Sequence, residues 1–403
     1  MLKNKKFIFI ISTFICCLCI SNMVSRYVFT KSASYSIDGT VDVKDRTFGV
    51  TDIILKVGYK DTSCVVQDAD GNDISKDVIK DFFVENEDVT DKYNNHFVQL
   101  KRYYVSMSQD TSGGDEDGVI TYKLAKTKKD SSYFVCPYFK DKDGSEIPYA
   151  YYGKYKGYVD SNYRLCSTSV DNPYPTNYVS NPIENFRTYA RKNGDQYCTT
   201  DWCAVFTVQI MMLCYYKTTN TRIKYYQRID INKIGLGDVA DRLCLGIEDI
   251  VGNGVECVDG MQLKYENNKL TLLYENNISA YSSSITNNET DISYLLKLKK
   301  LNDTDYNCFI KHMNYVSGSP ILSLFPKEYN QNDSFTESYS EYYCNRFYLY
   351  SFDNDTIKYA DWGSYGTTYL YCGPFFMSMH EFSATKDEGN YYETSRLHAK
   401  ILS

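Results

Sequence analysis

The chain has 403 residues, of which 43% are hydrophobic and 24% are charged, and its formal net charge at pH 7 is −7. These proportions are ordinary for a globular protein, and the length allows a membrane or signal element and two domains. The acidic balance argues against nucleic acid as the main partner, because phosphate binding requires a basic face. The chain has only four histidines and no Cys-x-x-Cys pair after residue 30, so the sequence indicates neither a zinc site nor a cofactor.

Residues 1–30 have the pattern of a signal peptide or a signal anchor. Lys3, Lys5 and Lys6 precede residues 7–25, which carry no charge. The apolar core of this run has the length of a signal-peptide h-region, whereas the whole run is long enough for a marginal transmembrane span. In both cases the positive-inside rule places everything after residue ~30 in the lumen or outside the cell. We therefore expect a secreted protein or a single-pass type II membrane protein, held in the membrane by this segment if it is uncleaved.

An exported chain meets an oxidising environment, which changes how its cysteines are interpreted. Spread widely in the sequence, they indicate a disulfide framework with at least one free thiol. Sequons for N-glycosylation fit the same compartment and predict a glycoprotein. The cysteines after the leader are Cys64, Cys136, Cys166, Cys198, Cys203, Cys214, Cys244, Cys257, Cys308, Cys344 and Cys372, and the sequons begin at Asn277, Asn288, Asn302, Asn332 and Asn354.

Residues 36–166 alternate short apolar runs with turn residues, as strands do. Examples are residues 48–59 and 97–107. This pattern predicts a β-rich N-terminal domain of unknown role. Residues 167–179 are rich in Pro, Asn and Ser, which is typical of a linker.

The most distinctive stretch of the chain is residues 202–216, which are uncharged and mostly apolar and follow a polar, turn-forming run. Because no polar face is left, the stretch predicts a helix buried at the centre of a core. It is too short for a membrane span, which needs roughly 18 apolar residues. Thr199, Thr200 and Asp201 supply capping side chains, and a negative group is favoured at this end of a helix. We expect a functional site at this N-terminus.

The remainder of the chain mixes helical and strand patterns. Residues 239–251 have apolar positions at helical spacing and end at a Gly-Asn-Gly stop. Together with the central helix, these patterns predict an α+β fold for residues 180–395. Strands are expected at residues 320–325, 345–352, 356–362 and 367–379.

The approach to the central helix carries a family resemblance. Lys192, Asn193, Gln196, Cys198 and Trp202 fall close to the K-N-Q-G-x-C-G-S-C-W-A-F segment with which papain-like cysteine peptidases open their central helix. The run from Cys198 to Trp202 also resembles the C-D-T-S-W of the serine-repeat antigens of malaria parasites, a branch in which some members lack the cysteine. The resemblance implies a papain-like two-lobe fold, with a helical lobe and a β-barrel lobe, over residues 180–395 after the β-rich domain.

The chain departs from this family at all three catalytic positions. Asp201 stands at the nucleophile position, Arg346 at the histidine position and Ala360 at the asparagine position, while Gln196 falls near the oxyanion glutamine. A cysteine peptidase needs a thiolate and an imidazole that accepts and returns a proton. A carboxylate attacks amides poorly, and a guanidinium stays protonated. The resemblance thus implies a homologue of cysteine-type peptidases with a hydrolase fold but without proteolysis, a pseudoprotease that binds a protein or peptide partner.

Two alternatives remain open for these residues. Asp201 and Arg346 form a salt bridge across the old cleft, or Asp201 only caps the helix and Arg346 only faces solvent. The alternative function for the whole chain is that of an active cysteine-type endopeptidase. Its nucleophile would be displaced to Cys203, with His312 or His380 as the partner histidine.

The resemblance also implies a disulfide at Cys198. The family's usual partner position, near Ile234, holds no cysteine, and Cys244 is the nearest alternative. A third interpretation discounts the resemblance and leaves a disulfide-linked surface protein with two unrelated β-rich domains. A helix that starts near Asp201 and faces a barrel strand at Arg346 would count against it.

Overall fold

A computed structural model describes most of the chain after residue 48, and residues 51–403 form one compact unit. The predicted leader, most of the predicted linker and part of the predicted helix at residues 239–251 lie outside the described residues. The described segments are 49–58, 64–114, 117–169, 182–219, 243–248, 250, 255–282, 285–297, 299–300, 305–330, 346–350, 356–364, 372–380 and 393–402.

The fold is α+β, as the sequence predicts, and its first sheet comes entirely from the N-terminal region. The strand order is β2-β1-β6-β5-β7, and every neighbouring pair is antiparallel. In β1, alternate residues are buried, because successive side chains of a strand point to opposite faces of the sheet. The strands are β1 (Asp52–Val57), β2 (Cys64–Gln67), β5 (Tyr104–Gln109), β6 (Ile120–Ala125) and β7 (Phe134–Val135).

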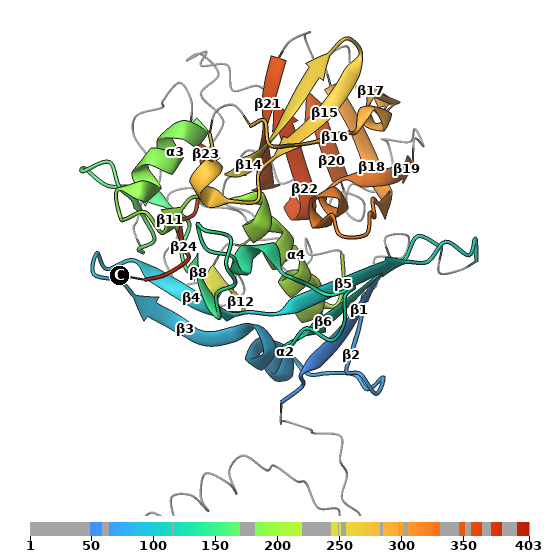
Figure 1. Cartoon of the computed structure of the whole chain (residues 1–403), viewed down its shortest axis with the longest axis horizontal. Helices are drawn as coiled ribbons and strands as arrows, with labels where there is room; N and C mark the ends of the chain where they lie inside the picture. Colours follow the sequence, from blue (N-terminus) through green and yellow to red (C-terminus); the bar gives the residue numbers. More distant parts are fainter. Residues whose placement is uncertain are drawn as a thin grey trace, which may run out of the picture. The chain divides into compact units, whose positions relative to one another are not determined.

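The second sheet joins distant parts of the sequence. Its order is β11-β24-β8-β4-β3, so the last strand of the chain lies between β8 and the strand that precedes the central helix (Figure 1). Described residues on both sides of the predicted linker therefore share one sheet. The strands are β3 (Val84–Thr90), β4 (His96–Lys101), β8 (Tyr149–Gly153), β11 (Tyr197–Cys198) and β24 (His398–Ala399).

The third sheet has ten strands and comes from the C-terminal half. Its main order is β16-β15-β14-β21-β22-β20-β18-β17, with β19 on β18 and β23 on β14. The described strands form open sheets and close into no barrel, so the barrel of a papain-like second lobe is not found among them. The strands are β14 (Val255–Glu266), β15 (Lys269–Tyr274), β16 (Asn288–Asp291), β17 (Lys299–Lys300), β18 (Asp305–Met313), β19 (Pro326–Asn330), β20 (Arg346–Tyr350), β21 (Thr356–Ser364), β22 (Cys372–His380) and β23 (Glu393–Thr394).

Two local predictions in the C-terminal half are wrong. Residues 243–248 form a hairpin of β12 (Leu243–Cys244) and β13 (Ile247–Glu248), with positive φ at both turn residues, Leu245 and Gly246. A helix cannot continue through such a turn. Residues 320–324 form the 3-10 helix η6 rather than a strand, with Pro320 at its first turn, where the missing N–H of proline costs nothing. The three later strand predictions are confirmed by β20, β21 and β22.

The central helix is confirmed over its whole predicted length as α4 (Trp202–Tyr216). Every residue from Trp202 to Cys214 is buried, and the helix stops at Lys217, which has φ 53°. The helix packs against the first sheet on one side and against β14 and β22 of the third sheet on the other (Figure 1). None of the helices in the described part of the chain is long and apolar enough to cross a membrane.

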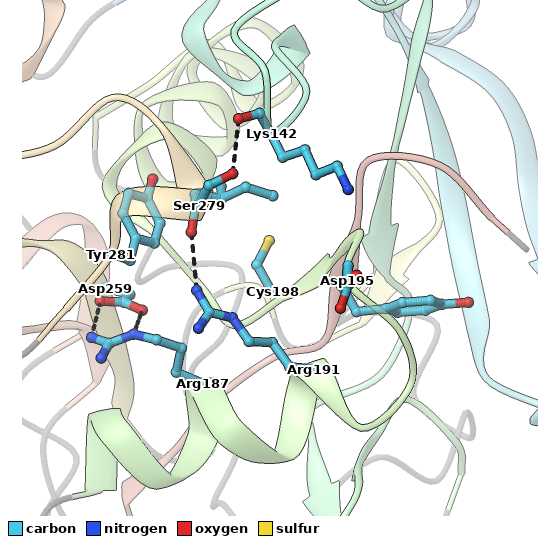
Figure 2. A pocket seen from close by; sticks show the side chains of 10 residues that line it. Lys142, Arg187, Arg191, Asp195, Cys198, Asp259, Ser279 and Tyr281 are labelled. Carbon is cyan, nitrogen blue, oxygen red and sulfur yellow. Dashed lines mark hydrogen bonds and ion pairs between the residues drawn. The ribbon is translucent and has the colours of Figure 1, made fainter.

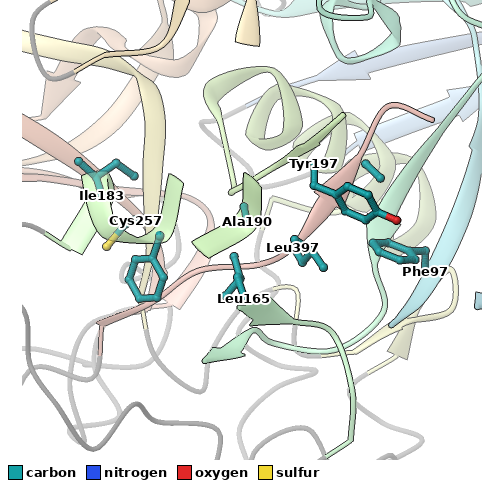
Figure 3. Close-up of a cluster of buried hydrophobic side chains, with 9 residues drawn as sticks. Phe97, Leu165, Ile183, Ala190, Tyr197, Cys257 and Leu397 are labelled. Carbon is teal, nitrogen blue, oxygen red and sulfur yellow. The ribbon is translucent and has the colours of Figure 1, made fainter. Parts of the chain in front are cut away.

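The other described elements are short helices and one small ladder. They are α2 (Lys76–Phe83), α3 (Pro182–Arg191), η1 (Pro137–Phe139), η4 (Ile278–Ala280), η5 (Ser293–Lys297) and the pair β9 (Tyr158–Val159) with β10 (Leu165–Cys166). A buried cluster beside α3 draws side chains from β4, β10, β11, β14 and the C-terminal strand (Figure 3). This cluster fixes α3 against the strand that leads into α4.

Several turns have the same structure, in which the side chain of an aspartate at the first position accepts hydrogen bonds from backbone N–H groups of the turn. Its Oδ1 atom accepts the backbone N–H groups two and four positions later. The fourth residue has positive φ, a conformation that favours Gly and Asn. The turns begin at Asp68, Asp91, Asp141 and Asp160, and their fourth residues are Gly71, Asn94, Gly144 and Tyr163.

Candidate functional site

Asp201 begins the central helix and is fully buried. Its Oδ1 accepts the backbone N–H of Ala204 at 2.7 Å, and its Oδ2 accepts the hydroxyl of Tyr281 at 3.0 Å. The predicted capping role is thus confirmed. Burial raises the pKa of the Asp201 carboxyl above its ordinary value, although Lys400 and the Ala204 N–H lower it. Both carboxylate oxygens are occupied by the protein itself.

The position of Tyr281 beside Asp201 depends on a glycine that leaves room for the ring. Gly260 has φ +78°, and a Cβ atom there would lie 2.8 Å from Cζ of the tyrosine ring. Any other residue would be strained in this conformation and would push the ring away. The backbone before Gly260 is itself tied to the helix approach, because the N–H of Asp259 donates to the carbonyl of Thr200 at 2.8 Å.

Tyr281 also lines a cavity of about 290 Å³, which we call the Cys198 cavity (Figure 2). Cys198, Ile278 and Tyr281 pack together as one of its walls. The cavity is lined by Lys142, Arg187, Arg191, Asp195, Tyr197, Cys198, Asp259, Ile278, Ser279 and Tyr281. These residues come from the loop after η1, from α3, from β11 and the loop before it, from β14, and from η4 and the residue that follows it.

The polar groups of the Cys198 cavity comprise one ion pair and several groups outside that pair. Arg187 grips Asp259 with two hydrogen bonds of 2.7 Å, the bidentate geometry of a strong ion pair. Arg191 donates from Nη2 to the Ile278 carbonyl at 3.2 Å. The Ser279 hydroxyl donates to the backbone carbonyl of Lys142 at 2.8 Å, which joins the two rims of the cavity.

The thiol of Cys198 points into this space but is not activated. It is free and only 6% exposed, and burial, followed by the charge of Asp201, raises its pKa to about 12. A thiol with this pKa is neutral at pH 7, whereas the nucleophile of a cysteine peptidase must be a thiolate. The described lining of the cavity contains no histidine that could act as a base.

Cys203 lies inside α4, away from the cavity lining, and is 2% exposed. Burial and then the charge of Asp201 raise the pKa of its thiol well above the ordinary value. These properties do not suit a nucleophile. Its suggested partner His312 is buried in β18, where the ring packs against Gly118 of a distant hairpin. The side chain of His380 lies outside the described residues.

The structure brings Ala360 near the site and separates it from Arg346. Ala360 pairs in β21 with Val258, the neighbour of Asp259, whereas Arg346 starts β20, and β22 lies between these two strands. The side chains of Arg346 and Ala360 lie outside the described residues, so the salt bridge from Asp201 stays a prediction. Gln196 does not line the cavity, and its buried Oε1 atom has no hydrogen-bond partner among the described residues.

The described cysteines after the leader do not form the expected disulfide framework. The cysteines whose side chains the structure describes are buried and outside any disulfide, including Cys198 and Cys244, which the resemblance suggests as a pair. Buried free cysteines behave as small hydrophobic residues, and that is how they pack here. The described residues also contain no cluster of His, Cys, Asp and Glu that could hold a metal ion. The cysteines described without a disulfide are Cys64, Cys136, Cys166, Cys198, Cys203, Cys214, Cys244 and Cys257.

A buried charge network behind the site was not predicted. The Glu256 carboxylate lies 2.8 Å from Nζ of Lys156 and 3.0 Å from Nη2 of Arg396, and all three side chains are fully buried. Burial alone would raise the pKa of Glu256, but the two cations lower it to about 2. Thr200 donates to the same carboxylate at 2.8 Å and lies 3.3 Å from Nε2 of His398. No sequence signal marks these residues, because charged side chains ordinarily indicate surface.

Neither protein-family models nor curated proteins yield a match to the chain. The resemblance to papain-like peptidases therefore rests on the motif residues of the sequence alone. The site itself is defined by its geometry, in which Tyr281 both bonds the capping carboxylate of Asp201 and lines the Cys198 cavity.

Proposed function

We propose that the protein is a non-catalytic relative of papain-like cysteine peptidases and that it acts by binding. One observation carries the proposal. The group at the nucleophile position, the Asp201 carboxylate, is buried, caps α4 and is bonded to Tyr281. A carboxylate in this position cannot reach a peptide bond.

The chemistry of the Cys198 cavity supports binding over hydrolysis. Peptide hydrolysis by a thiol needs a thiolate and a base that returns its proton to the leaving amine. The cavity offers a neutral thiol, a hydroxyl and cationic side chains instead. If the leader exports the chain, as we expect, the partner is a protein or peptide met in the secretory pathway or at a surface.

The test treats the purified full-length protein with a cysteine-directed peptide electrophile and, in parallel, with fluorogenic peptides. We expect no turnover and no adduct at Cys203 in the folded protein, because its thiol is buried. Labelling after denaturation is the control, since it shows by mass spectrometry that the same thiol is free. Saturable labelling of Cys203 with turnover that disappears in Cys203→Ala would instead establish an active endopeptidase.

A further inference from the structure

We infer that the Cys198 cavity binds a carboxylate group. The inference rests on the proposed function and deepens it, because it names the chemical class that the binding site takes. Its basis is a set of cationic groups that the described protein leaves without acidic partners, around a space large enough for a small ligand.

The charges around the cavity do not cancel. Lys142, Arg187 and Arg191 carry three positive charges and Asp195 and Asp259 two negative ones, so the formal sum of the lining is 3 − 2 = +1. Arg187 and Asp259 neutralise each other. Within the described residues, neither Lys142 nor Arg191 forms an ion pair with Asp195. In a chain of net charge −7, this lining complements a single negative charge.

The two open cations face the same space. Figure 2 shows Lys142 and Arg191 reaching into the cavity from opposite sides of Cys198. Arg191 uses one N–H for the Ile278 carbonyl, which orients its guanidinium and leaves further N–H groups for a ligand. A guanidinium binds the two oxygens of a carboxylate in a plane, while a lysine amine acts as a point charge.

The size of the cavity limits the ligand. Its volume of about 290 Å³ lies just below the range of roughly 300–1,000 Å³ that is typical of small-molecule pockets. The space suits one acidic side chain, a chain terminus or a small organic acid. The neutral thiol of Cys198 adds a weak donor and places no competing negative charge beside the ligand.

The test measures binding to the full-length protein by isothermal titration calorimetry. The probes are N-acetylglycine, its uncharged amide, and acetyl-Ala-Ala-Ala-Gly with a free or an amidated C-terminus. We expect binding of at least one free carboxylate and none of the matching amide. Arg191→Glu should weaken that binding by at least about tenfold. Lys142→Met should also weaken it, and this variant provides the test if Arg191→Glu fails to fold.

Lys192→Glu is the matched control, because it makes the same charge change one residue further on. The amine of Lys192 bonds the Asn162 carbonyl and does not line the cavity, so affinity should stay within about twofold. Binding of N-acetylglycine indicates a free small acid as ligand, and binding of the peptide acid alone indicates a partner's carboxylate. Equal binding of acid and amide, or no binding to folded protein, overturns the inference. Peptide turnover with a Cys203 adduct would overturn the proposed function instead, and the two failures are therefore distinguishable.

Discussion

Asp201 places a negative charge where water cannot reach it, and this has a measurable consequence. Its folded pKa is raised above 3.8, so above pH 3.8 the native state binds more protons than the unfolded state. The contribution of Asp201 to the free energy of unfolding therefore decreases as the pH rises from about 3.8 through the raised pKa of the folded state. Asp201→Asn keeps an oxygen for the Ala204 N–H and removes the charge, so we expect equal or higher stability at pH 7. Asp201→Ala loses the cap and should cost about 2 kcal/mol. Urea unfolding at pH 4 and 7 measures both.

The same pair of variants tests the predicted salt bridge. If Asp201→Asn is as destabilising as Asp201→Ala at pH 7, the second carboxylate oxygen is needed, either by the Tyr281 hydroxyl or by a cationic partner. A double-mutant cycle with Arg346→Met then measures the coupling directly. Zero coupling would remove the salt-bridge hypothesis and leave Asp201 as a helix cap.

His398 predicts a second pH dependence. Burial lowers its pKa well below 6.5, and the neutral ring lies 2.9 Å from the Tyr138 hydroxyl. Below pH 6.5 the His398 side chain binds a proton in the unfolded chain but stays neutral in the native state, so stability falls as pH decreases. Glu256, with a folded pKa of about 2 against 4.5, adds a further loss between pH 4.5 and 2. His398→Gln should remove the first loss and keep the second. The measurement is the urea midpoint of both proteins from pH 7 to 3. A loss of stability below pH 6.5 that is as large in His398→Gln as in the unchanged protein would contradict the prediction.

At the scale of elements, the aspartate turns make a prediction with a built-in control. Asp141 accepts the N–H groups of Asp143 at 2.8 Å and Ser145 at 3.1 Å. Asp141→Ala removes both bonds and should lower the free energy of unfolding by about 1 kcal/mol, since the turn is exposed to water. Asp143→Ala makes the same substitution at an exposed position whose side chain bonds nothing in the described structure, and should stay within about 0.5 kcal/mol. Equal losses in urea unfolding would show that the turn does not depend on the cap.

The elements also show what local sequence can and cannot predict. The α4 helix and its Asp201 cap follow from a long apolar run after a capping residue, and both are confirmed. The hairpin at residues 243–248 was missed, because helical spacing of apolar residues is ambiguous in a short stretch and the turn at Leu245 and Gly246 overrides it. The Cys198 cavity could not be predicted, since Lys142, Arg191 and Tyr281 meet only through the tertiary fold.

For the whole molecule, the placement of β24 predicts how the chain unfolds. Because this strand pairs with β8 on one side and β11 on the other, we expect one cooperative transition rather than separate N-terminal and C-terminal transitions. Ending the chain at residue 392 removes β24 and the fully buried Arg396, and should prevent folding. Ending it at residue 400 removes little buried surface and is the control.

Scanning calorimetry and near-UV circular dichroism measure these outcomes. Two calorimetric transitions in the full chain would show that its N-terminal and C-terminal parts unfold separately, and the predicted domain boundary would then separate two folding units. Native-like dichroism in the shortened chain would show that folding does not need β24.

The late position of β24 also sets the order of events during synthesis. Tyr138 and His398 are in contact but lie 260 positions apart, so the ribosome completes the second long after the first has emerged. At roughly 5–20 residues per second, the wait is about 13–50 s. Throughout that time β8 presents an open strand edge, which is a template for unwanted pairing. We therefore expect that the newly made chain needs this edge to be covered until β24 arrives, and that a product lacking its last residues leaves the edge of β8 open.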